Sequence, residues 1–124
     1  MSTPAASGNA DEETRRKSAE RVAELALARG RTIAVAESLT GGMIASALAQ
    51  AKQASEWFRG SLVAYSTPVK HQLLEVPAGP VVSSDAATAM ASSVRKLLLA
   101  DISVAVCAAA MLAALNALVG ALDR

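Results

Sequence analysis

The sequence predicts a single α/β domain, a three-layer α/β/α sandwich in which helices cover both faces of a sheet. Short runs of β-branched and apolar residues alternate with helical patterns in the order helix, strand, helix, strand, helix, helix, strand, helix. Such alternation is typical of layered α/β domains. The length of 124 residues suits one domain. Because aromatic residues make up only 2% of the chain, we expect a core built from Ala, Val, Leu, Ile and Met.

The first helix is expected over residues 11–29. Asn9 is placed to cap it, with Glu12 three residues further on. Gly30 is placed to end it. Residues 1–10 are rich in Ser, Ala, Gly and Pro and lack the apolar stretch of a signal peptide, so we expect a disordered lead before one domain at 11–124.

The middle of the chain carries shorter patterns. We predict a strand at 32–36, a helix at 42–51, a short turn at 54–58 that buries Trp57 and Phe58, and a second strand at 61–65.

Pro68 suits the first turn of a further helix, which Ser66 or Thr67 is placed to cap. After a loop rich in Pro and Gly, Ser83 or Ser84 is placed to cap the next helix. We predict that the inner face of that helix carries Ala86, Met90, Val94 and Leu97.

The last part of the chain allows two interpretations. Residues 102–122 carry no charge and are long enough to span a membrane as a helix. Alternatively, a buried strand at 102–106 precedes a helix in which leucines recur at 112, 115, 118 and 122. We favour the strand and helix because alanine-rich segments insert weakly into membranes. A membrane-tethered domain stays as the alternative.

Composition excludes several classes of function. The 12 basic and 11 acidic residues give a net charge of +1, which gives no electrostatic case for nucleic-acid binding. The single cysteine, Cys107, excludes an internal disulfide and suits a reducing compartment, and we expect it to be a small buried side chain. No Cys/His cluster suggests a metal site. We therefore expect a cytoplasmic protein without nucleic-acid or membrane partners.

Ser38 is the leading candidate nucleophile. It follows the first predicted strand and precedes Gly41 and Gly42, which permit close approach of a ligand to backbone N–H groups. The competing interpretation is that Ser38 only caps the following helix. Glu37 either orients a ligand or balances charge.

A second cluster follows the second predicted strand. Tyr65 and Lys70 supply a phenol and an amine five residues apart (70 − 65 = 5). A lysine early in a helix is disfavoured as a cation, which suits a general base. The alternatives are a half-buried strand tyrosine and a solvated lysine. His71, the only histidine, has no acidic neighbour and is expected at the surface, so a Ser-His-Asp triad is not predicted.

Three segments resemble the C-terminal domain of the CinA (competence/damage-inducible) family. They are Ala-Glu-Ser-Leu-Thr-Gly-Gly at 36–42, Gly-Ser-Leu-Val-Ala-Tyr-Ser-Thr-Pro-Val-Lys at 60–70, and Val-Ser at 82–83. The resemblance covers residues 20–106, and the separation of Ser38 from Tyr65 (65 − 38 = 27) fits the family pattern. Family members are nicotinamide-nucleotide amidohydrolases, which convert nicotinamide mononucleotide and water to nicotinic acid mononucleotide and ammonia in bacterial pyridine-nucleotide recycling.

The resemblance implies a serine enzyme without histidine. Ser38 would attack the carboxamide carbon, and Lys70, helped by Tyr65, would take the proton and pass it to the departing ammonia. Backbone N–H groups near residues 40–42 would hold the oxyanion. The implied partner is a small-molecule nucleotide, and the implied chemistry needs no metal or other cofactor. The implied substrate-binding residues are Glu37, Thr40, Gly41 and Gly42.

The chain departs from the family pattern at two places. Leu39 stands where the family usually has cysteine. The third strand leads into Cys107 and three alanines, where the family has a Thr-Gly-Ile-Ala-Gly-Pro loop and later strands. We therefore expect a shortened sheet with an open edge. The alternative function is a catalytically impaired CinA-like module that acts through homo-oligomerisation or through a partner covering that edge.

Overall fold

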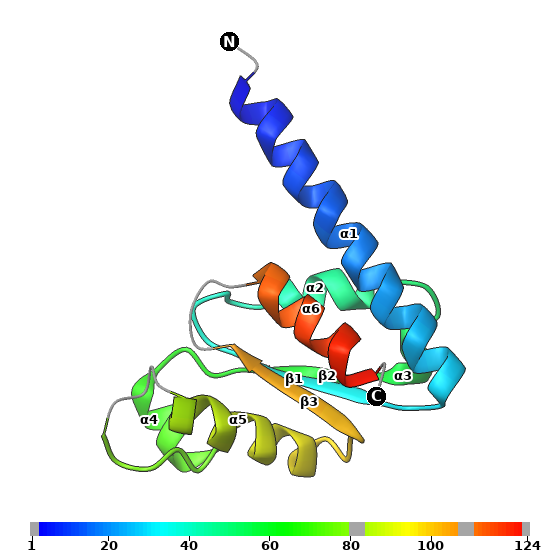
Figure 1. Ribbon diagram of the computed structural model, residues 1–124. Helices are drawn as coiled ribbons and strands as arrows, with labels where there is room; N and C mark the ends of the chain where they lie inside the picture. Colours follow the sequence, from blue (N-terminus) through cyan, green and yellow to red (C-terminus); the bar gives the residue numbers. More distant parts are fainter. Residues whose placement is uncertain (1–2, 80–83, 107–110, 123–124) are drawn as a thin grey trace.

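The computed structural model describes residues 3–79, 84–106 and 111–122. Its elements follow the predicted order, except that a short helix, α3, stands where a turn was expected (Figure 1). They are α1 (Thr3–Arg29), β1 (Ile33–Glu37), α2 (Met43–Ala49), α3 (Ala54–Trp57), β2 (Phe58–Val63), α4 (Thr67–Gln72), α5 (Ser84–Leu97), β3 (Ile102–Val106) and α6 (Met111–Leu122).

The three strands form a parallel sheet in the order β2-β1-β3. The central strand is buried at every position, as expected for a strand with neighbours on both sides and helices on both faces. Its last residue, Glu37, pairs with Val63 of β2 and Val106 of β3, so the carboxyl ends of all three strands meet at one edge. The predicted three-layer α/β/α sandwich with a small sheet is confirmed.

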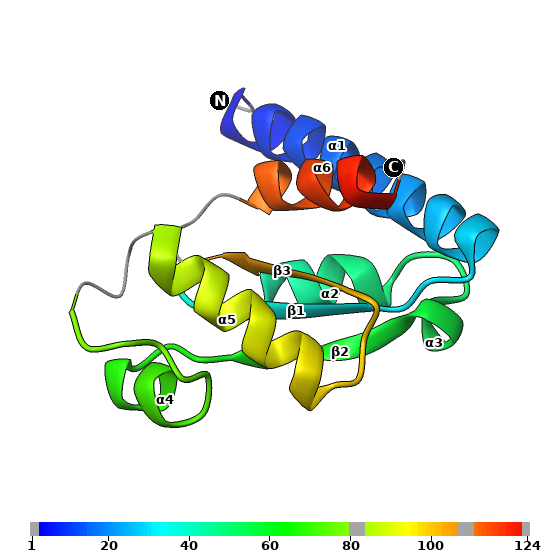
Figure 2. The ribbon, with the colours of Figure 1, turned by 60° about the horizontal axis from the view of Figure 1, so that its bottom comes forward.

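Alternate residues of β1 face two separate cores. Ile33 and Val35 pack with α1, α2 and α6, whereas Ala34 and Ala36 pack with the α5 side chains Ala86, Met90 and Val94. Figure 2 shows α1 and α6 on one side of the sheet and α4 and α5 on the other. The small alanines on the second face allow α5 to lie close to the sheet.

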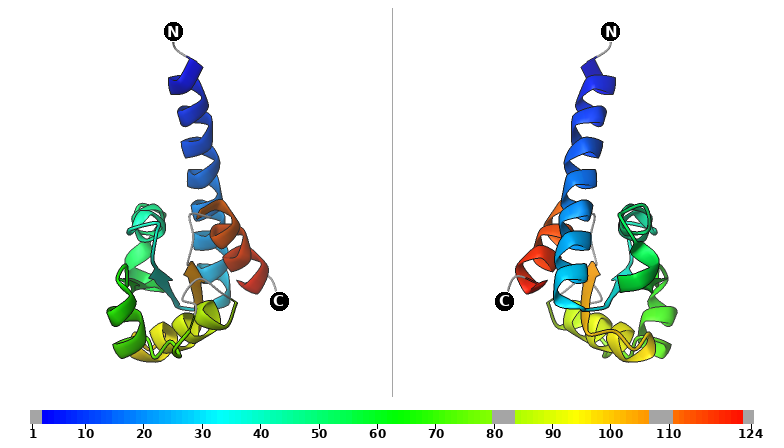
Figure 3. Two further views of the ribbon diagram at one scale, coloured as in Figure 1. Left: turned by 90° about the vertical axis from the view of Figure 1, so that its left-hand side faces the viewer. Right: turned by 90° about the vertical axis from the view of Figure 1, so that its right-hand side faces the viewer.

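The first helix is longer than the sequence predicts. It begins at Thr3 and not at Asp11, so Asn9 lies inside it and residues 3–10, which we expected to be disordered, are helical. Pro4 falls in the first turn, where proline is tolerated. Figure 3 shows the first half of α1 projecting beyond the rest of the molecule. The predicted end is confirmed: Gly30 has a φ of +62°, and the Arg31 amide donates to the carbonyl of Ala26 at 3.0 Å.

Most other predicted elements are confirmed with shifted ends. The second strand begins at Phe58, three residues earlier than expected, directly after the buried Trp57. Ser66 is the cap of α4, and its Oγ accepts from the Val69 amide at 3.5 Å. The expectation that Leu97 lies on the inner face of α5 is wrong, because this side chain is 51% exposed.

The uncharged segment near the end of the chain divides into β3 and α6, as the strand-and-helix interpretation predicts. Among the described residues, no helix is both long enough and apolar enough to cross a membrane. Cys107 and the three alanines after it lie outside the described residues, and so does Ser83.

Candidate functional site

The arrangement of the helices indicates a ligand-binding site at the carboxyl ends of β1 and β2. The connection after β1 leads to α2, which packs in the core with α1 and α6. The connection after the neighbouring strand β2 leads to α4 and α5 on the opposite face (Figure 2). In parallel α/β sheets, ligands bind at the carboxyl ends of two adjacent strands whose connections leave to opposite faces. Ser38 follows β1 and Tyr65 follows β2, so both lie at this edge.

Ser38 is fully buried, with 0% of its surface exposed. Its amide donates to the carbonyl of Val106 at 3.1 Å, and its carbonyl accepts from the Gly41 amide at 3.0 Å. Its hydroxyl has no hydrogen-bond partner, and among the described residues it is the only buried side-chain polar atom of which this is true. The N-cap of α2 is Gly42, so Ser38 does not cap that helix. An unsatisfied buried hydroxyl requires an explanation, and a catalytic role is one.

Glu37 supplies the cap that Ser38 does not. Its carboxylate is 0% exposed, and each oxygen accepts two hydrogen bonds. Oε1 accepts from the Thr40 hydroxyl and the Ile44 amide, both at 2.9 Å. Oε2 accepts from the Ala45 amide at 2.9 Å and from the Ser61 hydroxyl at 3.2 Å. The carboxylate therefore neutralises the first turn of α2 from inside the protein. A substrate-binding role for Glu37 and Thr40 stays a prediction.

The turn between β1 and α2 contains amides that are used internally and amides that are not. The Gly41 amide bonds to Ser38, and the Met43 amide donates to the Thr40 carbonyl at 3.1 Å. Within the described parts of the chain, the amides of Leu39, Thr40 and Gly42 have no internal acceptor. These three amides lie within four residues of Ser38 and are the donors of the turn that have no internal acceptor in the described structure.

Both glycines of the turn have backbone conformations that favour glycine. Gly41 has a φ of +62° and Gly42 a φ of +106°. A Cβ on Gly42 would lie 3.7 Å from Cγ2 of Val63, an ordinary contact, so backbone conformation and not space requires glycine there.

Lys70 is only 3% exposed, so the interpretation as a solvated lysine is wrong. It lies in α4, and no ion pair involving it is found among the residues that the structure describes. Tyr65 is 62% exposed and lies beyond the end of β2, so it is not a half-buried strand residue. Ser38 and Tyr65 follow the carboxyl ends of the neighbouring strands β1 and β2, and Lys70 lies in α4, the helix that follows β2. The described hydrogen bonds do not join them to one another.

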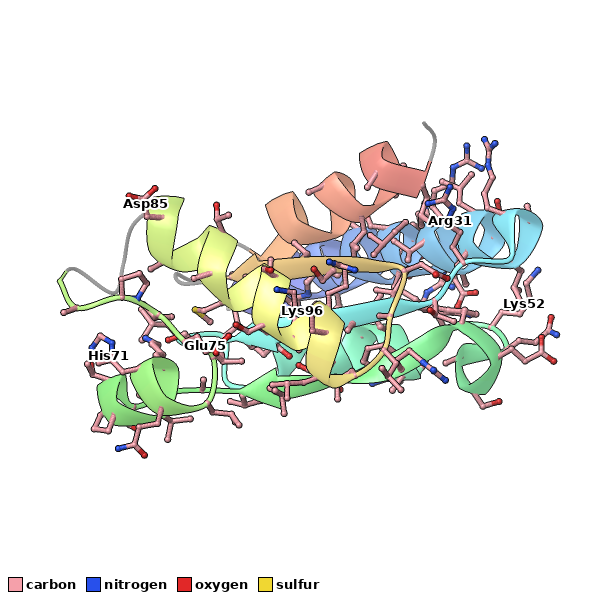
Figure 4. All side chains as sticks on the ribbon, turned by 90° about the horizontal axis from the view of Figure 1, so that it is seen from below. Arg31, Lys52, His71, Glu75, Asp85 and Lys96 are labelled. Carbon is pink, nitrogen blue, oxygen red and sulfur yellow. The ribbon has the colours of Figure 1, made fainter. Side chains whose placement is uncertain are left out.

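His71 is half-buried, which corrects the expectation of a surface residue. Its Nδ1 lies 2.7 Å from the carbonyl oxygen of Val76, so it ties α4 to the loop that follows. Figure 4 shows His71 and Glu75 at the α4 end of the molecule, with Arg31 and Lys52 at the opposite end. No group of three or more His, Cys, Asp or Glu side chains that could hold a metal ion occurs among the described residues.

Sequence reasoning missed Ser61 as part of this site. Its hydroxyl donates to Glu37 because both side chains lie on the same face of the sheet: Ser61 precedes by two residues Val63, the partner of Glu37. A parallel pairing of residues 33–37 with 58–63 would have predicted this contact.

Comparisons with known proteins agree with the fold and the motifs. The sequence model of the CinA C-terminal domain matches residues 15–111. A CinA-like protein of Prochlorococcus marinus is 42% identical over 90 residues, which is 68% of this chain and 21% of that protein. A CinA-like protein of Frankia casuarinae is 46% identical over 79 residues, 60% of this chain and 18% of its own length. The chain thus spans about a fifth of the length of the curated relatives it matches.

Solved structures match the fold as well. A competence or damage-inducible protein from Enterobacter asburiae is 30% identical with a TM-score of 0.73, over 75% of this chain and 62% of that one. A CinA superfamily protein from Enterobacter cloacae is 28% identical with a TM-score of 0.72, over 75% of this chain and 58% of that one.

Proposed function

Because the chain belongs to the CinA C-terminal domain family, we propose that it hydrolyses the carboxamide of nicotinamide mononucleotide, giving nicotinic acid mononucleotide and ammonia. The observation that carries this proposal is the buried hydroxyl of Ser38 at the carboxyl end of the central strand, which has no hydrogen-bond partner among the residues that the structure describes. A structural serine at that depth would be hydrogen-bonded. A nucleophile needs its hydroxyl free for the substrate and for a base.

In the proposed first step, Oγ of Ser38 bonds to the carboxamide carbon while its proton moves to the nitrogen of Lys70, which acts as the general base. The carbonyl oxygen becomes an oxyanion, which would be held by the amides of Leu39, Thr40 and Gly42, the donors of the turn without an internal acceptor in the described structure. The carbon–nitrogen bond then breaks, and ammonia leaves with the proton from Lys70. Tyr65, whose side chain is 62% exposed, would relay that proton or position the amine of Lys70.

In the second step, water adds to the acyl-serine, the carbon–Oγ bond breaks, and the hydroxyl of Ser38 is restored. Lys70 takes a proton from the water and returns it to Oγ, so the enzyme ends as it began. This sequence needs neither a histidine nor a change of redox state.

Ammonia release from nicotinamide mononucleotide tests the proposal. The purified protein and the variant Ser103→Ala should release ammonia, because the Ser103 hydroxyl bonds to the Ala91 carbonyl in the body of the fold. Ser38→Ala should release none. Absence of release from folded wild-type protein would refute the proposed activity, and equal release by Ser38→Ala would refute the nucleophile.

A second candidate function is favoured by the exposed apolar residues at the same edge. Large apolar side chains there are 39–62% exposed: Leu39, Met43, Val63, Tyr65, Val69 and Leu73. The outer strands β2 and β3 each have one side without a neighbouring strand. These unpaired strand sides and the exposed apolar side chains suit a catalytically impaired module that acts through homo-oligomerisation. That function predicts assembly that weakens on dilution together with no ammonia release. A strict monomer across a dilution series would exclude it.

A further inference from the structure

We infer that Glu37 is a positioning residue for the proposed nucleophile: its carboxylate holds the turn that carries Ser38 and does not contact the substrate. This inference rests on the proposed function for the role of Ser38, and on the hydrogen bonds of Glu37 for everything else.

The carboxylate of Glu37 has no capacity left for a ligand. A carboxylate offers about four lone-pair directions. The four donors of Glu37 are the hydroxyls of Thr40 and Ser61 and the amides of Ile44 and Ala45, two to each oxygen. With 0% of the residue exposed, a substrate group would have to displace one of these donors and leave it unpaired.

The same four bonds join three of the segments that shape the turn. Thr40 belongs to the turn itself, Ile44 and Ala45 to the first turn of α2, and Ser61 to β2. Glu37 is the residue before Ser38, so the carboxylate fixes where the chain leaves β1 and where it enters α2. The positions of the Leu39 and Thr40 amides relative to Ser38 depend on that path.

The arrangement also decides which amides serve an anion. The amides of Ile44 and Ala45, at the start of α2, are already bonded to the protein's own carboxylate. An oxyanion or a nucleotide phosphate therefore cannot use them. The oxyanion is left with the amides of the turn.

A merely structural cap and a positioning residue predict different results for Glu37→Gln. The glutamine side chain keeps the shape but replaces one acceptor oxygen with an NH₂ group, which leaves one α2 amide without an acceptor. A structural cap would lower only stability. A positioning residue would also slow the reaction of Ser38, because a displacement of about 1 Å costs roughly 100-fold in rate.

The test uses diisopropyl fluorophosphate, a probe that contains no nucleotide. Oγ of Ser38 bonds to phosphorus, the P–F bond breaks, fluoride leaves, and the serine proton passes to Lys70 or solvent. The labelling rate should fall roughly 100-fold in Glu37→Gln, and should be unchanged in Glu75→Gln, whose carboxylate is exposed near the same end (Figure 4). With nicotinamide mononucleotide, kcat should fall and KM should stay the same. A raised KM with unchanged labelling would show that Glu37 binds substrate, and would overturn the inference.

Hydrogen exchange separates failure of this inference from failure of the proposed function. In Glu37→Gln the amide of Gly41 and at least one of the amides of Ile44 and Ala45 should exchange faster than in the wild type; unchanged exchange of all three overturns the inference. If wild-type Ser38 is not labelled, the proposed nucleophile fails and exchange alone decides the role of Glu37. Should Glu37→Gln not fold, Thr40→Val removes one of the four donors and should give smaller changes in the same direction; no change in either readout would refute the inference.

Discussion

Replacing Ser38 with alanine should stabilise the protein while it abolishes the proposed activity. The hydroxyl is fully buried and has no partner in the part of the chain that the structure describes, so folding removes it from water without giving it a hydrogen bond there in return. An alanine keeps the Cβ and removes only the oxygen. The substitution therefore removes a desolvation penalty and leaves no other polar group unpaired.

The size of the effect follows from the structure. An unsatisfied buried polar group costs about 1–3 kcal/mol. Removal of the oxygen atom also removes its dispersion attraction to its neighbours, which offsets part of this gain, so we expect a net stabilisation of about 1–2 kcal/mol. For 124 residues the unfolding entropy is about 0.26 kcal/mol/K, so each kcal/mol corresponds to about 4 °C and the melting temperature should rise by about 4–8 °C.

Ser93→Ala is the matched control, because Ser93 is also buried but its hydroxyl donates to the Leu74 carbonyl at 2.5 Å. That variant leaves an unpaired carbonyl and should melt lower, by about 4 °C for a loss of about 1 kcal/mol. Thermal unfolding of both variants, followed by circular dichroism, gives the two signs directly. If Ser38→Ala melts at or below the wild-type temperature, the hydroxyl has a partner in the folded protein and the reasoning is wrong.

Three further predictions concern other residues. Lys70→Met should keep the wild-type melting temperature or raise it, since the residue is 3% exposed and forms no ion pair in the described structure. The same variant should slow ammonia release by about 100- to 10,000-fold; unchanged release would exclude Lys70 as the base. Gly42→Ala should lose about 1–3 kcal/mol in thermal unfolding because of its φ of +106°, and a neutral result would show that the turn adapts. The amide and hydroxyl of Thr32 hold the pKa of Asp101 below its ordinary value of 3.8. A carboxyl whose pKa is lower in the folded protein stabilises the fold at pH values above its unfolded-state pKa, and this stabilisation is lost as the pH falls through its folded-state pKa. Asp101→Asn should therefore lose less stability than the wild type when the pH is lowered below about 4. An identical loss of stability in both proteins would refute this.

The backbone plan could be predicted from the sequence because each element carries a local signal. The β-branched run at 32–35, the cap at Ser66 and the helix terminator at Gly30 act through residues close in the chain. The sequence did not predict the start of α1, because Gly8 and Asn9 are as compatible with a disordered segment as with the interior of a helix. Helix propensity favours neither structure strongly at these positions.

The burial and the hydrogen bonds of the site residues could not be predicted, because both depend on contacts with residues far away in the sequence. Lys70 is buried although its local sequence is that of an ordinary helix start. The cap of α2 comes from Glu37, seven residues before Ile44 and outside the usual capping positions. Ser61 joins that carboxylate across the sheet, from 24 residues away.

The alternation of β1 explains why one dipeptide supplies both the support and the proposed nucleophile. Successive strand residues point to opposite faces, and Ile33 and Val35 face the core with α2 while Ala34 and Ala36 face the core with α5. Glu37 continues the first series and reaches the start of α2. Ser38, whose amide still bonds to Val106 of β3, continues the second series, on the face where α5 packs. Insertion of one residue between Glu37 and Ser38 would reverse that relation, so the spacing of these two residues is as strict a requirement as their identity.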